Sequence, residues 1–191
     1  MLLARAAMPV EHPLEVPVTD ERLRSAIAAH FGSLRRVLRR LGLPEFEVDD
    51  VAQEAFLALY RKGSAIHPRA ERQFLLQAAI RLVVARQRYF SRRREDLEAT
   101  FDQFEQVRPT PEEELGQQQA LRILDGILTA MPLELRMVFN LCELEQLSVP
   151  DAAAILEVPV GTATSRLRRA REQFEKLAAR VRVAHGSGGA R

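Results

Sequence analysis

The segment SVPDAAAILEVPVGTATSRLRRAR, residues 148–171, decides how the second half of the chain folds. Ser148 is a residue type that caps helices, and Asp151 three positions later completes a capping-box pattern. A first helix then runs until Glu157-Val158-Pro159 breaks it. Beyond the break, apolar residues recur at steps of three and four, the period of a buried helical stripe: Val160, Ala163, Leu167, Ala170, Phe174 and Leu177. The pattern predicts two helices joined by a tight turn.

The second of these helices has a basic outer face. At about 100° per residue, Ser165, Arg168 and Arg169 point away from the apolar stripe, and Arg166 lies on its flank. A short helix, a turn and a basic helix form the geometry that enters a DNA major groove. Arginines on an exposed helix can also be an ordinary solvated surface. The motif alone therefore leaves DNA binding and a plain helical hairpin both open.

Composition narrows the class of protein. The chain has 191 residues, enough for one domain or two small ones, and its hydrophobic content of 47% excludes a wholly disordered chain. Its net charge is only +2, but only two of its 28 basic residues are lysines. Arginine makes forked hydrogen bonds with phosphates and guanine edges that lysine cannot match. The codon bias of a GC-rich genome would produce the same preference for arginine.

Several functional classes are not expected. A single cysteine, Cys142, can build no disulfide framework or thiolate metal cluster, and its apolar surroundings favour a buried structural thiol. The four histidines are scattered, and we find no nucleophile constellation or phosphate-binding glycine loop. We therefore expect no enzyme activity, metal or cofactor. Without a signal peptide or a long apolar run, we also expect a cytoplasmic protein.

The apolar periodicity is helical throughout, which predicts an all-α protein of two small domains joined by a flexible acidic linker. Helices are expected at 20–41, at 48–62 and at 69–93, the last with one break at most. Two more are expected after the acidic stretch, one that ends at Ala130 and one at 133–144. Leu23, Ile27 and Phe31 are among the inward residues of the first helix. The resulting division is a loose arm over 1–18, a first domain over 19–94, a linker over 95–113, a second domain over 114–183 and a flexible tail over 184–191.

Charge changes sign abruptly between the two domains. Residues 81–94 contain six arginines and no acid, whereas residues 95–114 contain eight acids and one arginine. The acidic stretch has little apolar periodicity and ends in Pro109-Thr110-Pro111. This composition is typical of a linker.

The helix at 48–62 carries two kinds of side chain outside its apolar stripe. Its first turns are acidic and amide-rich, and apolar bulk follows them: Asp49, Asp50, Gln53 and Glu54, then Phe56, Leu57 and Tyr60. Acids near a helix N-terminus also have a purely structural explanation in the helix dipole. The face is either a protein-docking surface or a wider buried face, and both remain open.

At this point the chain resembles a known family. VDDVAQEAFLALYRK (48–62) resembles the part of bacterial sigma factors that docks on core RNA polymerase, and residues 131–172 resemble their promoter-reading region four. The order and two-domain size are similar to the extracytoplasmic-function (ECF) group, which keeps only regions two and four. The resemblance covers about residues 20–180. It implies a dissociable subunit that binds core polymerase and directs promoter-specific initiation through DNA binding and promoter melting.

The resemblance also implies roles for single residues. The helix face with Asp49, Asp50, Gln53, Glu54 and Phe56 would contact the clamp coiled coil of the largest polymerase subunit. The 64–68 loop and the long helix would melt the minus-ten element, with a basic and aromatic set holding the single strand: Arg81, Arg86, Arg88, Tyr89, Phe90, Arg92 and Arg93. The minus-thirty-five element would be read by Gly161, Thr162, Ser165, Arg166, Arg168 and Arg169. The group commonly has an anti-sigma factor, which would be a third partner.

Four positions depart from the family pattern. Arg81 stands where Asn is common, Phe74 where tryptophan is common, Thr164 where a basic residue is usual, and Glu157 where the hairpin turn usually has glycine. The rival interpretation is a helix-turn-helix regulator that acts on duplex DNA without polymerase, which leaves the acidic face of 48–62 unexplained. A second rival is an adaptor that binds proteins only.

Overall fold

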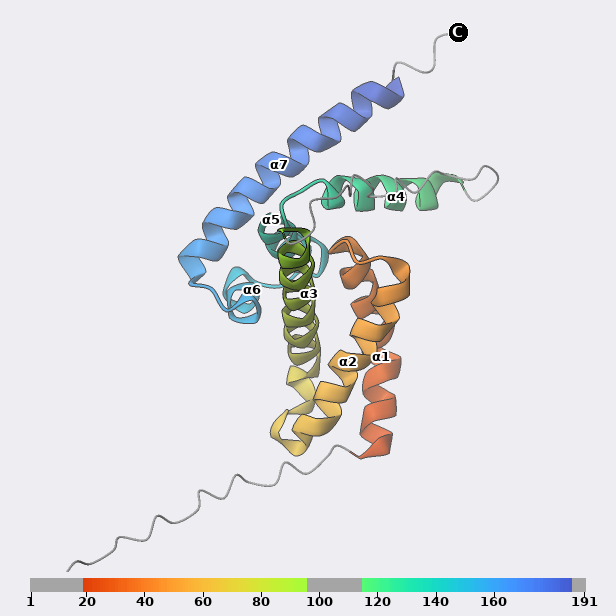
Figure 1. The fold of residues 1–191 in the computed structure, drawn as a ribbon, viewed down its shortest axis with the longest axis vertical. Coiled ribbons are helices and arrows are strands. Elements are labelled where there is room, and N and C mark those ends of the chain that lie inside the picture. Colours follow the sequence, from red (N-terminus) through yellow and green to blue (C-terminus); the bar gives the residue numbers. More distant parts are fainter. Residues whose placement is uncertain (1–18, 96–114, 187–191) are drawn as a thin grey trace, which may run out of the picture.

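A computed structural model describes residues 19–95 and 115–186, and within them the chain is all helical, without a strand (Figure 1). The predicted arm, almost all of the predicted linker and the end of the predicted tail lie outside these residues. The main helices are α1 (Asp20–Arg40), α2 (Glu45–Lys62), α3 (Glu71–Glu95), α4 (Leu115–Thr129), α5 (Leu133–Phe139), α6 (Val149–Leu156) and α7 (Val160–Gly186). Three short turns join them: η1 (Gly63–Ala65), η2 (Pro68–Ala70) and η3 (Asn140–Leu144), the last a π-helix.

The front half is a bundle of α1, α2 and α3. The Thr19 side chain caps α1 by accepting a hydrogen bond from the Arg22 backbone N–H. Gly42, at φ 87°, ends the helix in a conformation that costs glycine little. The predicted stripe of α2 is fully buried: Val48, Val51, Ala52, Ala55 and Leu59. Burial of each valine or leucine side chain contributes about 1.5–3 kcal/mol.

The back half contains the predicted pair of helices, α6 and α7. The Ser148 hydroxyl accepts from the Asp151 N–H at 3.2 Å and donates to the Asp151 carboxylate at 2.6 Å, which confirms the predicted cap. Glu157 then turns the chain in the left-handed conformation, at φ 56° and ψ 42°. In the core of this half, the ring of Phe139 in α5 stacks on the ring of Phe174 in α7, with the two ring centroids 4.7 Å apart.

The two halves pack against each other through a shared core. Met137, Leu141, Ala152 and Ile155 of the back half belong to the same buried cluster as the front bundle. In Figure 1, α3 stands at the centre, with α1 and α2 on one side and α6 on the other. The sequence did not predict this packing, because nothing in the periodicity of a helix names its partner.

Other differences from the sequence-based expectations are local. Helix α2 begins three residues before the predicted start, at Glu45, and α3 runs without a break. The predicted 64–68 loop begins in the short turn η1 and ends in η2. The prediction that Ile27 points inward is wrong, because its side chain lies in a groove at the surface and is 38% exposed.

Candidate functional site

Helix α7 presents a basic face to solvent. Arg168 and Arg169 are exposed and Arg166 is half-buried, while Leu167 and Ala170 between them are buried. Arg168 pairs with Glu172 one turn later, at 2.7 Å. Among the described residues, no carboxylate pairs with Arg166 or Arg169. Two guanidinium groups on one exposed face are therefore available to an anionic partner.

The first turn of α7 is open to a close approach. A Cβ atom added to Gly161 would meet no atom within 4 Å. The hydroxyl of Ser165 donates to the Thr162 carbonyl and that of Thr164 to the Val160 carbonyl, both at 2.9 Å. These bonds hold the small polar side chains close to the helix, so the surface around them stays shallow.

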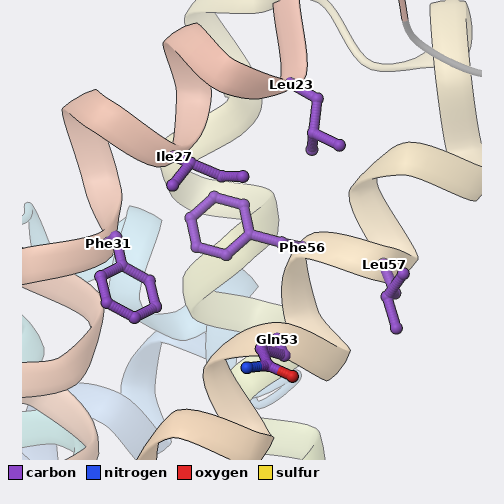
Figure 2. Close-up of a pocket in the computed structure, with 6 residues that line it drawn as sticks. All are labelled: Leu23, Ile27, Phe31, Gln53, Phe56 and Leu57. Atoms are coloured by element: carbon purple, nitrogen blue, oxygen red, sulfur yellow. The ribbon is translucent and has the colours of Figure 1, made fainter. Parts of the chain in front are cut away.

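An apolar groove of about 240 Å³ lies between α1 and α2 (Figure 2). Phe56 forms its floor, 5% exposed and 6.2 Å from the ring of Phe31. Leu57 and Gln53 line it from the solvent side of α2, and Leu57 is 49% exposed. Of the two interpretations of this helix, the wider buried face holds for Phe56, whereas Leu57 extends the exposed surface.

Gln53 is the polar residue that lines the groove, and the acidic side chains of α2 lie outside its lining. Asp49 pairs with Arg35 at 2.7 Å, and Asp50 and Gln53 are exposed. Glu54 is about half exposed and pairs with Arg86 of α3, also at 2.7 Å. The ion pair brings together one residue from the predicted polymerase-binding set and one from the predicted DNA-binding set.

The residues predicted to hold the melted DNA strand lie along α3. Arg81 is 62% exposed and donates from Nε to Glu157 at 2.7 Å. Arg86 makes the pair with Glu54 described above. The other five residues occupy the last turns of this helix, and their side chains lie outside the described set: Arg88, Tyr89, Phe90, Arg92 and Arg93.

A buried arginine that sequence reasoning missed joins the two halves. The Arg136 guanidinium donates to the carbonyl of Leu41, at the end of α1, and to those of Thr129 and Met131, at the end of α4 (2.8, 2.5 and 2.7 Å). Carbonyls at helix C-termini lack helical partners and attract cations. Burial lowers the pKa of Arg136 to about 10, so the group stays charged at neutral pH.

Asn140 extends this contact by one helical turn. Its side-chain amide donates to the Val37 carbonyl at 3.4 Å, four residues before Leu41. Arg136 and Asn140 are themselves four residues apart in an otherwise apolar run. That spacing puts two polar groups on one buried face, and it was the available signal for an interface.

Glu145 forms a second polar centre between the halves. Its carboxylate, 7% exposed, lies 2.8 Å from Arg72 and 3.6 Å from Arg40, and it accepts from the Ser33 hydroxyl at 3.2 Å. A buried carboxylate needs such partners to offset its lost hydration. All three partners belong to the front half.

Comparison with known proteins identifies this combination of elements. The family model described as "Sigma-70, region 4" matches residues 121–174, which include α5, α6 and the basic face of α7. The ECF RNA polymerase sigma-E factor of Haemophilus influenzae is 32% identical over 155 residues, covering 75% of this chain and 78% of that protein. The chain belongs to the ECF RNA polymerase sigma factors.

Two further matches support the assignment. The ECF sigma factor SigE of Mycolicibacterium smegmatis is 28% identical over 86% of this chain, which spans 63% of that relative's length. The sigma factor RpoE of Bartonella quintana, solved in complex with the anti-sigma factor NepR, has the same fold, with a TM-score of 0.68 at 19% identity. This match covers 83% of this chain and 98% of RpoE.

Membership settles the class of the protein and its fold. ECF sigma factors are transcription initiation factors with helical domains, and the rival of a regulator that acts without polymerase is not favoured. Within 19–95 and 115–186, no helix is long and apolar enough to cross a bilayer. The same residues hold no group of three or more metal-ligating side chains.

Proposed function

We propose that the chain confers promoter selectivity on core RNA polymerase through three surfaces on separate elements. The α1–α2 groove and the acidic first turns of α2 dock on the polymerase clamp, α3 holds the melted minus-ten strand, and α7 reads the minus-thirty-five duplex. The observation that carries the proposal is the exposed α7 face with its two unpaired arginines, which a protein-only adaptor would not need.

The groove supports polymerase docking by its chemistry. It combines an apolar floor with the Gln53 amide at its edge, and the carboxylates of Asp49 and Asp50 are exposed on the same helix. A desolvated centre with polar groups around it is the usual anatomy of a protein interface. An anti-sigma factor is a further proposed partner, since the sigma factor RpoE was solved in complex with the anti-sigma factor NepR. Such a factor would inhibit by covering the same surfaces.

The assignment of the groove is tested by binding core polymerase to full-length variants. Gln53 is exposed and has no described hydrogen-bond partner, so Gln53→Ala should leave stability unchanged. If it lies at a docking surface, the same change should weaken core binding by about tenfold, or 1.4 kcal/mol. Arg24→Ala is the control, because Arg24 is also exposed but lies on α1. Equal affinities for all three proteins would rule out the groove as the docking site.

Promoter selectivity is tested by transcription from a library of promoter fragments. Core polymerase with the wild-type chain should initiate at a defined subset of start sites. Arg169→Ala should reduce initiation at the start sites that depend on a minus-thirty-five element. A chain that binds core but gives no start-site selectivity would refute the proposed function.

A further inference from the structure

Arg86 of α3 lies against α2, and both of its acidic partners belong to α2. Its Nη2 donates to Oε1 of Glu54 at 2.7 Å, and its Nη1 lies 3.9 Å from Oε2 of Glu47. The Arg86 side chain is 28% exposed, and its Nη1 atom is buried without a hydrogen bond to any described residue. The guanidinium therefore lies in the contact between two helices.

A second arginine holds the opposite flank of α2. Arg35 of α1 pairs with Glu45 and with Asp49, each at 2.7 Å, and its Cζ atom lies 5.9 Å from the centroid of the Phe31 ring. Among the five acids of α2, Asp50 is the one that pairs with no described residue. The outward ridge of the helix, between the two flanks, is exposed: Phe46, Asp50, Gln53 and Leu57.

This ridge has the composition of a protein contact. Phe46 is 78% exposed and Leu57 is about half exposed, and a carboxylate and an amide stand between them. Large exposed apolar side chains beside polar groups fit a partner that offers apolar area and hydrogen-bond donors. Glu54 borders the ridge, and its Oε2 accepts no hydrogen bond from a described residue, so one oxygen of this carboxylate is open to the same partner.

We propose that Arg86 is a positioning residue for the polymerase-docking face of α2 and does not contact the melted strand. By donating to one oxygen of Glu54, it holds the carboxylate beside the ridge with the other oxygen open. This proposal rests on the proposed function, because it assumes that core polymerase docks on α2. It removes Arg86 from the set of residues that the sequence assigned to single-stranded DNA.

Electrostatics explain why Arg86 does not serve both partners. A phosphate that bound this guanidinium would have to displace Glu54, and its charge would then lie close to two carboxylates of α2, which repel it. Arg81 on the same helix is 62% exposed and is the natural comparison for a residue that contacts the strand.

The affinity of full-length variants for core polymerase tests the positioning role. A side chain that must be ordered on binding weakens affinity by about two- to tenfold, and this loss is expected for Arg86→Met. Arg86→Lys keeps a cation within reach of Glu54 and should recover part of the loss. Because the pair is partly exposed, the melting temperature of Arg86→Met should fall by no more than about 4 °C. Wild-type core affinity in Arg86→Met would overturn the proposal.

A double-mutant cycle separates positioning from general stability. Glu54→Gln keeps the shape of the side chain and removes its charge, so it should weaken core binding at least as much as Arg86→Met. If Arg86 acts through Glu54, adding Arg86→Met to Glu54→Gln should cause no further loss. Losses that multiply in the double variant would show that Arg86 acts independently of Glu54 and would overturn the proposal.

Arg22 provides the matched control within the same bundle. It is 24% exposed, and its partners, the Glu71 carboxylate and the Ile66 carbonyl, lie outside α2. Because Glu71 is buried, Arg22→Met should lower the melting temperature at least as much as Arg86→Met, yet leave core affinity unchanged. Equal weakening of core binding in both variants would mean that affinity follows the stability of the bundle, against the proposal.

The strand is tested in holoenzyme formed with saturating core, so that weaker assembly does not affect the result. Binding to a fluorescent single strand of mixed sequence is measured over a range of salt concentrations. Arg86→Met should match wild type in affinity and in salt dependence, whereas Arg81→Met should lose affinity and reduce the slope by about 0.7. A reduced slope for Arg86→Met would place this guanidinium on the strand and overturn the proposal.

Failure of this proposal is distinguishable from failure of the proposed function. If Gln53→Ala and Glu54→Gln weaken core binding but Arg86→Met does not, α2 docks on polymerase and the positioning role alone is refuted. If none of the three changes affects core binding, docking on α2 is refuted, and the positioning role falls with it.

Discussion

Arginines serve opposite purposes at the junction of the two halves and on the outer face of α7. At the junction, Arg136 and Arg72 each donate to carbonyls or carboxylates of the described chain. On α7, Arg166 and Arg169 have no such partner among the described residues. The same side chain is structural where it donates within the chain and available to a ligand where it does not.

Desolvation explains why the two groups must differ. Burial favours the neutral form of Arg136 and lowers its pKa to about 10, so its charge is tolerable only because three carbonyls accept from it. Exposed guanidinium groups keep their hydration until a phosphate replaces it. Substitutions in the first group should therefore cost stability, and substitutions in the second should cost DNA affinity alone.

The largest effect is expected at Arg136. Methionine is of similar length but leaves the carbonyls of Leu41, Thr129 and Met131 without their donor, so Arg136→Met should lower the free energy of unfolding by about 3 kcal/mol. For a chain of this size, that corresponds to a fall of roughly 6–12 °C in melting temperature. Urea and thermal unfolding, monitored by circular dichroism, would measure the free energy of unfolding and the melting temperature.

Arg171→Met is the matched control for this change. Arg171 pairs with Glu143 at 2.7 Å on the exposed side of α7, where an ion pair contributes at most about 1 kcal/mol. A loss at Arg136 no larger than the loss at Arg171 would contradict the structural role of the buried guanidinium.

A smaller loss of stability is expected from Gly42→Ala, which acts on the same contact from the other side. Gly42 has a φ of 87°, and an added Cβ would lie 2.4 Å from Nη1 of Arg136. Backbone strain of about 1–2 kcal/mol and displacement of the guanidinium should together cost about 2 kcal/mol. Gly126→Ala in α4 has open space around it and should be neutral or slightly stabilising. Equal unfolding midpoints for the two variants would contradict the close contact at Gly42.

The same contrast shows how far the sequence could predict this molecule. The capped helix at Ser148, the buried stripe of α2 and the outward placement of Arg168 and Arg169 follow from local periodicity, and the structure confirms them. Which helices meet is a long-range property. The contacts of Arg136 and Glu145 join residues about a hundred positions apart, and no local pattern specifies them.

Two of the departures from the family pattern illustrate the same limit. Arg81 and Glu157 each looked like an isolated anomaly in the sequence, one in a helix and one in a turn. In the folded chain they are partners, 2.7 Å apart across the junction. The side chains of the aromatic and basic cluster at the end of α3 lie outside the described set, so their predicted role stays a prediction.

On α7, the comparison predicts a loss of binding without a loss of stability. Arg169→Ala should weaken holoenzyme binding to duplex promoter DNA by about tenfold and reduce the slope of its salt dependence by about one. Its melting temperature should match that of wild type, because no described contact is broken. Arg180→Ala, exposed about three turns further along the same helix, is the control. An equal loss in both variants would indicate general electrostatic attraction instead of a defined DNA-reading face.

The smallest effect is expected at Cys142, between the junction and α7. Burial raises the pKa of this thiol, the Glu143 carboxylate raises it further, and Arg171 opposes them. In the folded chain, alkylation should therefore be slower at pH 8 than in urea, and its rate should keep rising with pH beyond the range of a free thiol. Glu143→Gln removes the second cause and should accelerate alkylation about twofold. A pH profile identical in folded and unfolded protein would show that Cys142 is not held in the partly desolvated position between the two cores.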